Sequence, residues 1–372
     1  MNSTALSRRR TPGGLGAAAR ALCLVLCGLA AVAAAAQRVE MKLLEYNVEN
    51  LFDLRHDAGC NDADFLPDGA CAWDSLRYRK KLTGLARVIA AAGGERPADL
   101  VALCEVENDS VLRDLTRRTR LMRLGYGFIA TESRDGRGMD VALLYQPARF
   151  QPIAVDTLRL GYTAGRERPT RDILHVAGRI PTGDTLDVVV AHWPSRRGGA
   201  ERTAPYRFRA ARRIACLADS LRCLRRNFLM IVAGDFNDEP ADRSLCEGLR
   251  ALPLSKCQTL WENENLPAAS CAFVNLSAEL TADDGRVRGT YKYKGHWNRL
   301  DHILLNEEAF RRKGKPRVGH CACEILALPF LLQEEKGRYN EVTPYRTYLG
   351  RFYQGGVSDH LPLLLTFELL AE

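Results

Sequence analysis

The sequence predicts a single domain of the α/β class, because short apolar runs alternate with helical patterns along the chain. The runs have the length of strands, and several end in a polar side chain, as strands buried on both faces of a sheet do. No internal repeat and no low-complexity linker follows residue 37. A hydrophobic content of 46% and a charged content of 26% are those of an ordinary globular protein.

The first 36 residues differ from the rest and predict a signal peptide that is removed on export. Arginines at the start precede an apolar stretch over residues 21–34, and Ala36 fits a cleavage site before Gln37. The stretch is shorter than the ~20 apolar residues that cross a membrane. We therefore expect a periplasmic, cell-surface or secreted domain over residues 37–372, without a membrane span. Lipid modification of Cys27 is the alternative, but Leu26 fits a lipoprotein cleavage site poorly.

The exported chain would be mildly basic and rich in cysteine. Residues 1–36 carry four arginines and no acid, so their removal lowers the formal charge from +8 to +4. A charge of this size does not identify a binding partner by itself. Export permits disulfides, and Cys60 and Cys71 bracket a polar loop, so we predict a bond between them. No spacing of cysteines and histidines is typical of zinc.

The first half of the mature chain predicts two strands that end in polar groups, each followed by a helix. Leu82, Leu85 and Ile89 have helical spacing, and Gly93-Gly94 ends that helix. The predicted elements are a strand over 39–46, a polar loop over 54–72, a helix over 73–92, a strand over 99–105, a helix over 108–122, and strands over 126–131 and 140–145.

The second half predicts further strands around one long amphipathic helix. The predicted elements are strands over 150–160, 173–180 and 186–191, a helix over 203–224, a strand over 229–233, an irregular region over 241–285, and strands over 297–305 and 361–369. Asp301 and His302 are neighbours on a strand and face opposite sides, so only one of them can face a site.

The strand over 229–233 leads into Gly234-Asp235-Phe236-Asn237, the stretch that is most informative about function. If the chain stays extended, Asp235 and Asn237 emerge on one side at the carboxyl end of the strand, where open α/β sheets build their sites. A carboxylate beside a carboxamide can hold a metal ion or a water next to a phosphate. The same residues also form turns. Asn47 and Glu105 end two other strands, and this convergence favours a functional site.

Basic residues follow the strand over 186–191. His192 comes directly after it, and Arg196 and Arg197 are expected to contact phosphate because guanidinium groups match phosphate oxygens. Arginines in residues 134–137 and 166–171 also suit a polyanion.

Six short motifs occur in an order that resembles the endonuclease/exonuclease/phosphatase superfamily, the metal-dependent phosphoesterases similar to deoxyribonuclease I. The resemblance covers residues 40–369 and implies a four-layer α/β/β/α sandwich of two mixed sheets flanked by helices. The motifs are Tyr46-Asn47-Val48-Glu49, Leu103-Cys104-Glu105-Val106-Glu107, Ala191-His192-Trp193-Pro194, Gly234-Asp235-Phe236-Asn237, Arg299-Leu300-Asp301-His302 and Ser358-Asp359-His360.

The resemblance implies a metal site at three of these motifs. Glu105 is the expected main metal carboxylate, with Asn47 near the metal and the phosphate. Asp359 is expected as a second or water-mediated ligand, and Glu49 in the outer shell. Oxygen ligands without thiolates favour Mg²⁺, with Mn²⁺ or Ca²⁺ as substitutes.

The resemblance also implies the catalytic set. Asp235 orients or deprotonates the attacking water, and Asn237 holds water or phosphate. His192 and His360 bracket the scissile phosphate, and Asp301 orients His360. His302 stands where the family varies and is left out of this set. Metal ions with His and Asn donors supply the charge stabilisation that phosphodiester hydrolysis needs.

These expectations describe an exported, Mg²⁺-dependent, monomeric endonuclease that acts on DNA or RNA without a protein partner. The alternative is a phosphatase or phospholipase-like esterase acting on inositol phosphates or sphingomyelin. An esterase that acts on membrane lipids would need an exposed apolar loop to reach the membrane. Residues 326–332 are a candidate for this loop, although packing in the core also explains their apolar character. A third reading, a non-catalytic binding protein on the same scaffold, does not suit a chain that keeps every site residue.

Overall fold

The computed structural model describes residues 37–160, 170–262, 271–282, 285–311, 317–335 and 341–371. The predicted signal peptide lies outside the described residues, as does most of the basic connection over 166–171.

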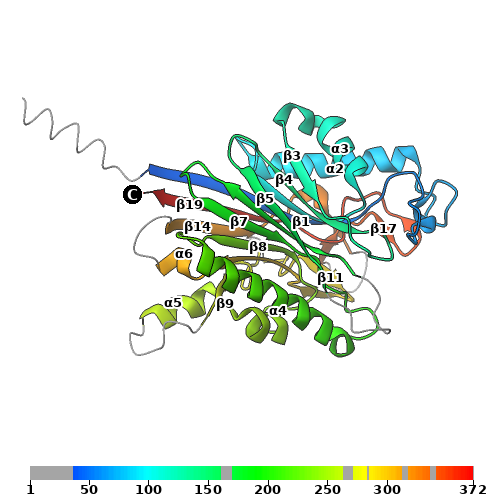
Figure 1. Cartoon of the computed structure of the whole chain (residues 1–372). Coiled ribbons are helices and arrows are strands. Elements are labelled where there is room, and N and C mark those ends of the chain that lie inside the picture. Colours follow the sequence, from blue (N-terminus) through cyan, green and yellow to red (C-terminus); the bar gives the residue numbers. More distant parts are fainter. Residues whose placement is uncertain are drawn as a thin grey trace, which may run out of the picture.

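Two mixed sheets lie face to face, as predicted (Figure 1). The first sheet has six strands, in the order β14 (Arg317–Ile325), β19 (Leu363–Ala371), β1 (Gln37–Leu51), β2 (Leu100–Val106), β4 (Asp140–Tyr145) and β3 (Gly127–Ala130). The second has seven, in the order β5 (Gln151–Leu158), β6 (Ile173–Arg179), β7 (Thr185–Val190), β8 (Met230–Asp235), β13 (Asp301–Asn306), β10 (Phe273–Asn275) and β9 (Ala251–Pro253).

Strand β8 shows why the inner strands are continuously apolar. Ile231 and Ala233 belong to the core between the two sheets, whereas Met230 and Val232 face a second core under helix α4 (Ala200–Leu224). Because successive side chains of a strand point to opposite faces, a strand between two apolar layers needs apolar residues at every position. The apolar run before Asp235 is therefore a consequence of its central place in the sheet.

Helices cover both outer faces and complete the four layers. Figure 1 shows α2 (Ser75–Gly93) and α3 (Asp109–Arg117) outside the first sheet, and α4 with α5 (Leu254–Glu262) on the opposite side. Helix α2 begins at Asp74, whose side chain accepts hydrogen bonds from two backbone N–H groups of the first turn. It ends at Gly94, with φ +64°. The predicted helix over 108–122 is α3 followed by the 3₁₀ turn η2 (Arg120–Leu124).

The region over 241–285 was predicted as irregular, and this is wrong for its described part. It contains the π-helical turn η3 (Ser244–Leu249), β9, α5 and β10, and β9 and β10 form one edge of the second sheet. Strands of three residues are too short to show an alternating pattern in the sequence.

The remaining elements are short and connect the larger ones. They are the turns η1 (Ala63–Phe65) and η4 (Pro329–Leu331), helix α6 (Glu308–Arg311), and three two-stranded sheets, β11 (Tyr291–Tyr293) with β12 (His296–Asn298), β15 (Leu332–Glu334) with β16 (Val342–Pro344), and β17 (Tyr348–Leu349) with β18 (Phe352–Tyr353).

The predicted Cys60–Cys71 disulfide is absent, and all ten cysteines of the described residues are free thiols. Cys60 lies against Gly138, whereas Cys71 is buried in the hydrophobic core, and its carbonyl oxygen accepts from Arg77 and Tyr348. Cys104 is likewise a buried thiol. The cysteine pair with a direct sulfur–sulfur contact is Cys257 and Cys271, at 3.4 Å. The predicted bond is therefore not seen in the structure, and spacing across a polar loop carries no information on the direction of either side chain.

Residues 326–332 pack against the core, which supports core packing as the reason for their apolar character. Leu326, Leu328 and Phe330 are partly buried against it, and the guanidinium of Arg87 lies 3.7 Å from the centre of the Phe330 ring. Among the described residues, no helix has the length and apolar character needed to cross a membrane.

Candidate active site

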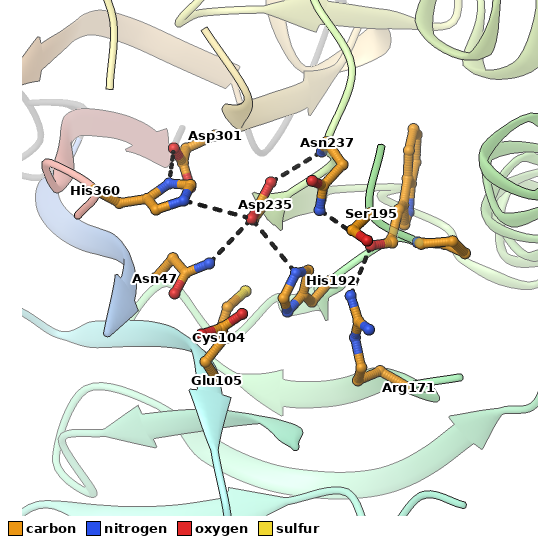
Figure 2. Close-up of polar contacts among 12 residues, drawn as sticks. Asn47, Cys104, Glu105, Arg171, His192, Ser195, Asp235, Asn237, Asp301 and His360 are labelled. Atoms are coloured by element: carbon orange, nitrogen blue, oxygen red, sulfur yellow. Dashed lines mark hydrogen bonds and ion pairs between the residues drawn. The ribbon is translucent and has the colours of Figure 1, made fainter. Parts of the chain in front are cut away.

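The ends of strands from both sheets meet around the side chain of Asp235 (Figure 2). Asp235 is the last residue of β8 and lies directly opposite Asp301, the first residue of the antiparallel β13. Past the end of β7, the backbone N–H of Trp193 donates to the carbonyl oxygen of Asp235, which places His192 beside it. Asn47 approaches from β1 of the facing sheet. The site therefore forms only where the two sheets pack together.

Four groups contact the Asp235 carboxylate. Asn47 donates from Nδ2 to Oδ2 at 3.0 Å, and the backbone N–H of Asn237 donates to Oδ1 at 2.9 Å. The Nε2 atoms of His192 and His360 lie 3.4 and 3.9 Å from Oδ2. Burial and the nearby charge of Asp301 raise the pKa of Asp235 to about 7, against the lowering effects of His360 and the two hydrogen bonds. This carboxylate can therefore take up a proton near neutral pH.

The two histidines have opposite charge preferences. Burial acts to lower the pKa of His360, but Asp301, at 2.7 Å from Nδ1, together with Asp235, raises it well above its ordinary value. Burial and the positive charges of Arg171 and Arg137 hold the pKa of His192 well below its ordinary value. His360 is therefore a buried cation and His192 a neutral imidazole, so the site offers one charged and one uncharged donor.

The chain turns sharply after Asp235 instead of staying extended. Asn237 has φ +52°, and its Nδ2 donates to the carbonyl oxygen of Trp193 at 3.1 Å. The turn interpretation of this stretch is therefore correct, yet both side chains remain at the site. Gly234 has φ +142°, and a Cβ there would lie 1.9 Å from the carbonyl oxygen of Ala191. Only glycine permits this close approach of β7 and β8.

Glu105 lies beside this cluster in an unusual backbone conformation. Its φ is +65°, at an irregularity in the pairing of β2 with β4, and such left-handed non-glycine residues are found preferentially at functional sites. Oε2 accepts a hydrogen bond from the backbone N–H of Asn50, and Oε1 lies 3.5 Å from Nη2 of Arg137. Burial acts to raise the pKa of Glu105, but Arg137, Arg171 and His360 hold it below its ordinary value. The carboxylate is therefore ionised although only 14% of the side chain is exposed.

A buried lysine fixes the segments that carry Asn47 and His360. Nζ of Lys81 donates to the carbonyl oxygens of Glu49 and Val357 and to Oγ1 of Thr347. The hydroxyl of Ser358 in turn donates to the carbonyl oxygen of Asn47 at 2.7 Å. These bonds hold the end of β1 against the loop before β19.

The structure brings seven of the ten predicted site residues together, with Asp235 at their centre. Those around Asp235 are Asn47, His192, Asn237, Asp301 and His360, with Glu105 adjacent. Asp359 lies 3.6 Å from Arg346. Arg196 donates to the carbonyl oxygen of Asn237 and to Asp242, so its guanidinium holds the loop after β8, and its contact with phosphate stays a prediction. Arg197 is exposed on that loop.

The sequence also matches a known family over most of its length. The matching model is that of the Endonuclease/Exonuclease/phosphatase family, and it covers residues 42–369. This chain belongs to that family. Members of the family hydrolyse phosphoester bonds and depend on divalent metal ions. No curated protein sequence matches the chain significantly.

Solved structures of low sequence identity share the fold. An endonuclease/exonuclease/phosphatase family protein from Bacteroides thetaiotaomicron is 15% identical, with a TM-score of 0.54 over 90% of this chain and 100% of its own. A mannosyl-6-phosphatase from Bacteroides thetaiotaomicron VPI-5482 is 15% identical, with a TM-score of 0.52 over 88% and 99%. D. rerio TDP2 complexed with a single-strand DNA product is 15% identical, with a TM-score of 0.50 over 88% and 98%.

The donor set fits the divalent metal on which this family depends. Among the described residues, the side chains of Asp235, Asp301 and His360 offer ligand atoms within 4.8 Å of one another. His360 and Asp301 are already bonded to each other, however, so a metal there would have to break that pair. Glu105 presents an ionised carboxylate oxygen whose neighbour is the half-exposed Arg137. We therefore regard Glu105 as the better metal ligand.

Sequence reasoning missed part of the site of this family member. Arg171 and Arg137 approach His192 and Glu105, and Asp135 contacts both guanidinium groups. The arginines of both loops were predicted to suit a polyanion, but their contacts with Asp135 and their approach to His192 and Glu105 were not predicted. Tyr291 packs on His360, with ring centres 4.7 Å apart, and nothing in its sequence context predicted this contact.

His302 has a structural role, consistent with its exclusion from the catalytic set. Nδ1 accepts a hydrogen bond from Asn275, and Nε2 donates to the carbonyl oxygen of Asp238. The ring lies near Phe236, and burial lowers the pKa of His302 from 6.5 to about 4. Asp301 faces His360 instead, so only one member of the pair faces the site, as predicted.

We expect the neutral state of His302 to make the folded protein acid-sensitive. Between pH 6.5 and about 4 the unfolded chain binds a proton that folded His302 does not, so stability falls as the pH is lowered through this window. The His302→Asn variant should lose this component, which is on the order of 3 kcal/mol at the acid end. Urea unfolding at several pH values measures it, with His296→Asn, at an exposed histidine, as the matched control. Equal pH dependence in wild type and His302→Asn would contradict the assignment.

Proposed function

We propose that this protein is a metal-dependent phosphodiesterase that hydrolyses the internucleotide bonds of DNA or RNA. The observation that carries the proposal is the set of contacts on Asp235, where a carboxylate with a pKa of about 7 meets a cationic His360 and a neutral His192. Phosphodiester hydrolysis needs a base for the water and positive or hydrogen-bonding groups for the phosphoryl oxygens. This arrangement offers both within one buried site.

The residues divide the work according to their charge states. Asp235 accepts the proton of the attacking water, because burial brings its pKa close to neutral. His360, oriented by Asp301, places a positive charge on the phosphoryl group. His192 and Asn237 donate hydrogen bonds that hold the phosphate, since the carbonyl of Trp193 fixes Asn237 in place. Asn47 keeps Asp235 oriented through its bond to Oδ2.

A divalent cation would be held chiefly by Glu105, whose partly exposed carboxylate remains ionised. When bound, it would supply a Lewis acid that neutralises charge on the phosphoryl oxygens. Asn47 donates a hydrogen bond to Asp235 and therefore lies in the same part of the site. The oxygen donors favour Mg²⁺ as the cation, with Mn²⁺ or Ca²⁺ as substitutes.

The choice of nucleic acid as substrate rests on the positive groups around the site. Arg137 and Arg171 approach it from one side, and a polyanion supplies the charges that match them. One protein with this fold is complexed with a single-strand DNA product and another is a mannosyl-6-phosphatase, so the fold alone does not choose between a polymer and a sugar phosphate. Export and a monomeric state remain part of the proposal.

A panel of substrates tests the proposal directly. Residues 37–372 purified with Mg²⁺ are incubated with plasmid DNA, single-stranded DNA, RNA, inositol phosphates, sphingomyelin and mannose 6-phosphate. We expect cleavage of nucleic acid with little dependence on sequence, weakening as salt rises. Intact DNA and RNA at low salt, together with phosphate release from a sugar or inositol phosphate, would overturn the nuclease assignment and leave the phosphoesterase one.

A further inference from the structure

One carboxylate, Asp135, joins two arginines at the edge of the site. Oδ2 of Asp135 lies 3.3 Å from Nη1 of Arg171, and Oδ1 lies 3.8 Å from Nε of Arg137. Oδ1 also accepts the backbone N–H of Arg137 at 3.0 Å. Asp135 is itself buried, with 8% of its surface exposed. We call Arg137 and Arg171, which share the carboxylate of Asp135, the arginine pair.

Arg171 is the fixed member of the arginine pair. It is 6% exposed, and its Nη2 donates to the carbonyl oxygen of Trp193 at 2.8 Å. Its Nε is buried and has no hydrogen-bond partner in the structure. An unpaired donor on a buried cation is costly, which favours an anionic partner supplied from outside the chain.

Arg137 is the movable member. Its side chain is 42% exposed, and its contacts with Glu105, Asp135 and the side-chain oxygen of Asn50 are 3.5, 3.8 and 3.3 Å long. Long, partly exposed ion pairs of this kind contribute little to stability. Arg137 can therefore turn from Glu105 to an incoming anion at small cost.

The arginine pair adjoins the residues that would hold the scissile phosphate. The carbonyl oxygen of Trp193 accepts from both Arg171 and Nδ2 of Asn237, so these two donors share one acceptor. Figure 2 shows Arg171 reaching the same part of the site as Asn237 and His192. An anion bound by Arg171 would therefore lie close to Asn237 and His192.

We propose that the arginine pair binds a second phosphate of the substrate, the one that neighbours the scissile phosphate along a nucleic acid strand. The inference rests on the proposed function, which assigns Glu105 to the metal ion and leaves Asp135 alone to balance two guanidinium groups. Guanidinium groups bind phosphate oxygens through paired charge-assisted hydrogen bonds, and the unpaired Nε of Arg171 is such a donor. A sugar monophosphate has no second phosphate for this position, so the arginine pair favours polymers.

Dinucleotides with and without a terminal phosphate test the inference. The substrates are thymidylyl-thymidine, which has one phosphodiester, and the same molecule carrying a phosphate at its 5′ or its 3′ end. We expect wild type to prefer one phosphorylated form roughly ten- to hundredfold in kcat/KM, the range for hydrogen bonds to charged groups. Arg137→Gln and Arg171→Gln should each lower this ratio towards one. The ratio compares substrates on one enzyme, so a general loss of activity does not affect it.

Two controls make the result specific. Arg117→Gln removes an exposed positive charge on α3 and should keep the full preference. Arg171→Lys keeps the positive charge but loses the forked pair of guanidinium N–H donors, so it should keep only part of the preference for the phosphorylated dinucleotide. If Arg171→Gln fails to fold, as thermal melting would reveal, the half-exposed Arg137 still provides the test.

The outcomes separate the two proposals. Equal cleavage of all three dinucleotides by wild type, or an unchanged preference in both glutamine variants, would overturn the arginine pair and leave the phosphodiesterase standing. Failure of wild type to cleave any dinucleotide or longer strand would overturn the nuclease function, and the subsite with it.

Discussion

The Asp235→Asn variant is expected to lose roughly 10²–10⁴-fold in kcat, with a much smaller change in KM, because a carboxamide cannot accept the proton of the attacking water. The substitution is nearly isosteric and leaves one oxygen to accept from either Asn47 or the backbone N–H of Asn237, which bond different oxygens of Asp235. Since the pKa of Asp235 is about 7, wild-type kcat should rise with pH through this value as the base becomes ionised. The variant should lose that rise.

Steady-state kinetics from pH 5.5 to 9 on a nucleic acid substrate measure both effects. Asp242→Asn is the matched control, because it removes a carboxylate on the loop after β8 that binds Arg196 instead of facing the site. If Asp235→Asn kept the kcat and pH profile of wild type, Asp235 would not be the base.

The Glu105→Gln variant is expected to abolish metal-dependent turnover while the fold is kept. Glutamine preserves the length of the side chain and an acceptor for the backbone N–H of Asn50, but it removes the charge that a hard cation requires. Titration calorimetry with Mg²⁺ or Mn²⁺ should show binding to wild type and none to the variant. Wild type should gain thermal stability from the metal ion, because a ligand that binds the folded state stabilises it.

Glu107→Gln provides the matched control two residues along the same strand end. Burial raises the pKa of Glu107 to about 8, so it is mostly uncharged at pH 7 and a neutral amide should replace it at small cost. Its oxygen accepts the backbone N–H of Asp53 and does not face Asp235. Full activity of Glu105→Gln, or of wild type in excess chelator, would remove Glu105 from the metal site.

The residues at strand ends were predictable because their positions follow from the sheet. Asn47, Glu105, His192 and Asp235 each follow or end an apolar run in the sequence, and an inner strand covered on both faces is mostly apolar before its end. Side-chain direction beyond a strand end was not predictable. Arg196 follows His192 closely in sequence, but the loop turns its guanidinium to Asp242.

The contacts of the arginine pair show why the rest of the site could not be predicted from the sequence. Arg137 and Arg171 come from separate loops, and their common partner Asp135 has no sequence pattern that distinguishes it from an ordinary turn residue. The same limit applies to Cys257 and Cys271, whose sulfur atoms lie 3.4 Å apart although no sequence pattern pairs them. Contacts between loops depend on tertiary packing, which local periodicity does not contain.

The strand that carries Asn47 lies between β2 and β19, so the first strand of the described chain is hydrogen-bonded to the last (Figure 1). Nine residue pairs connect β1 to β19, from Gln37 with Ala371 to Glu45 with Leu363. During synthesis, β1 leaves the ribosome long before its partner exists, and pairings so distant in sequence form slowly. We therefore expect the active site to be completed only after β19 has paired with β1, so that a nascent chain without β19 would hold no organised catalytic centre.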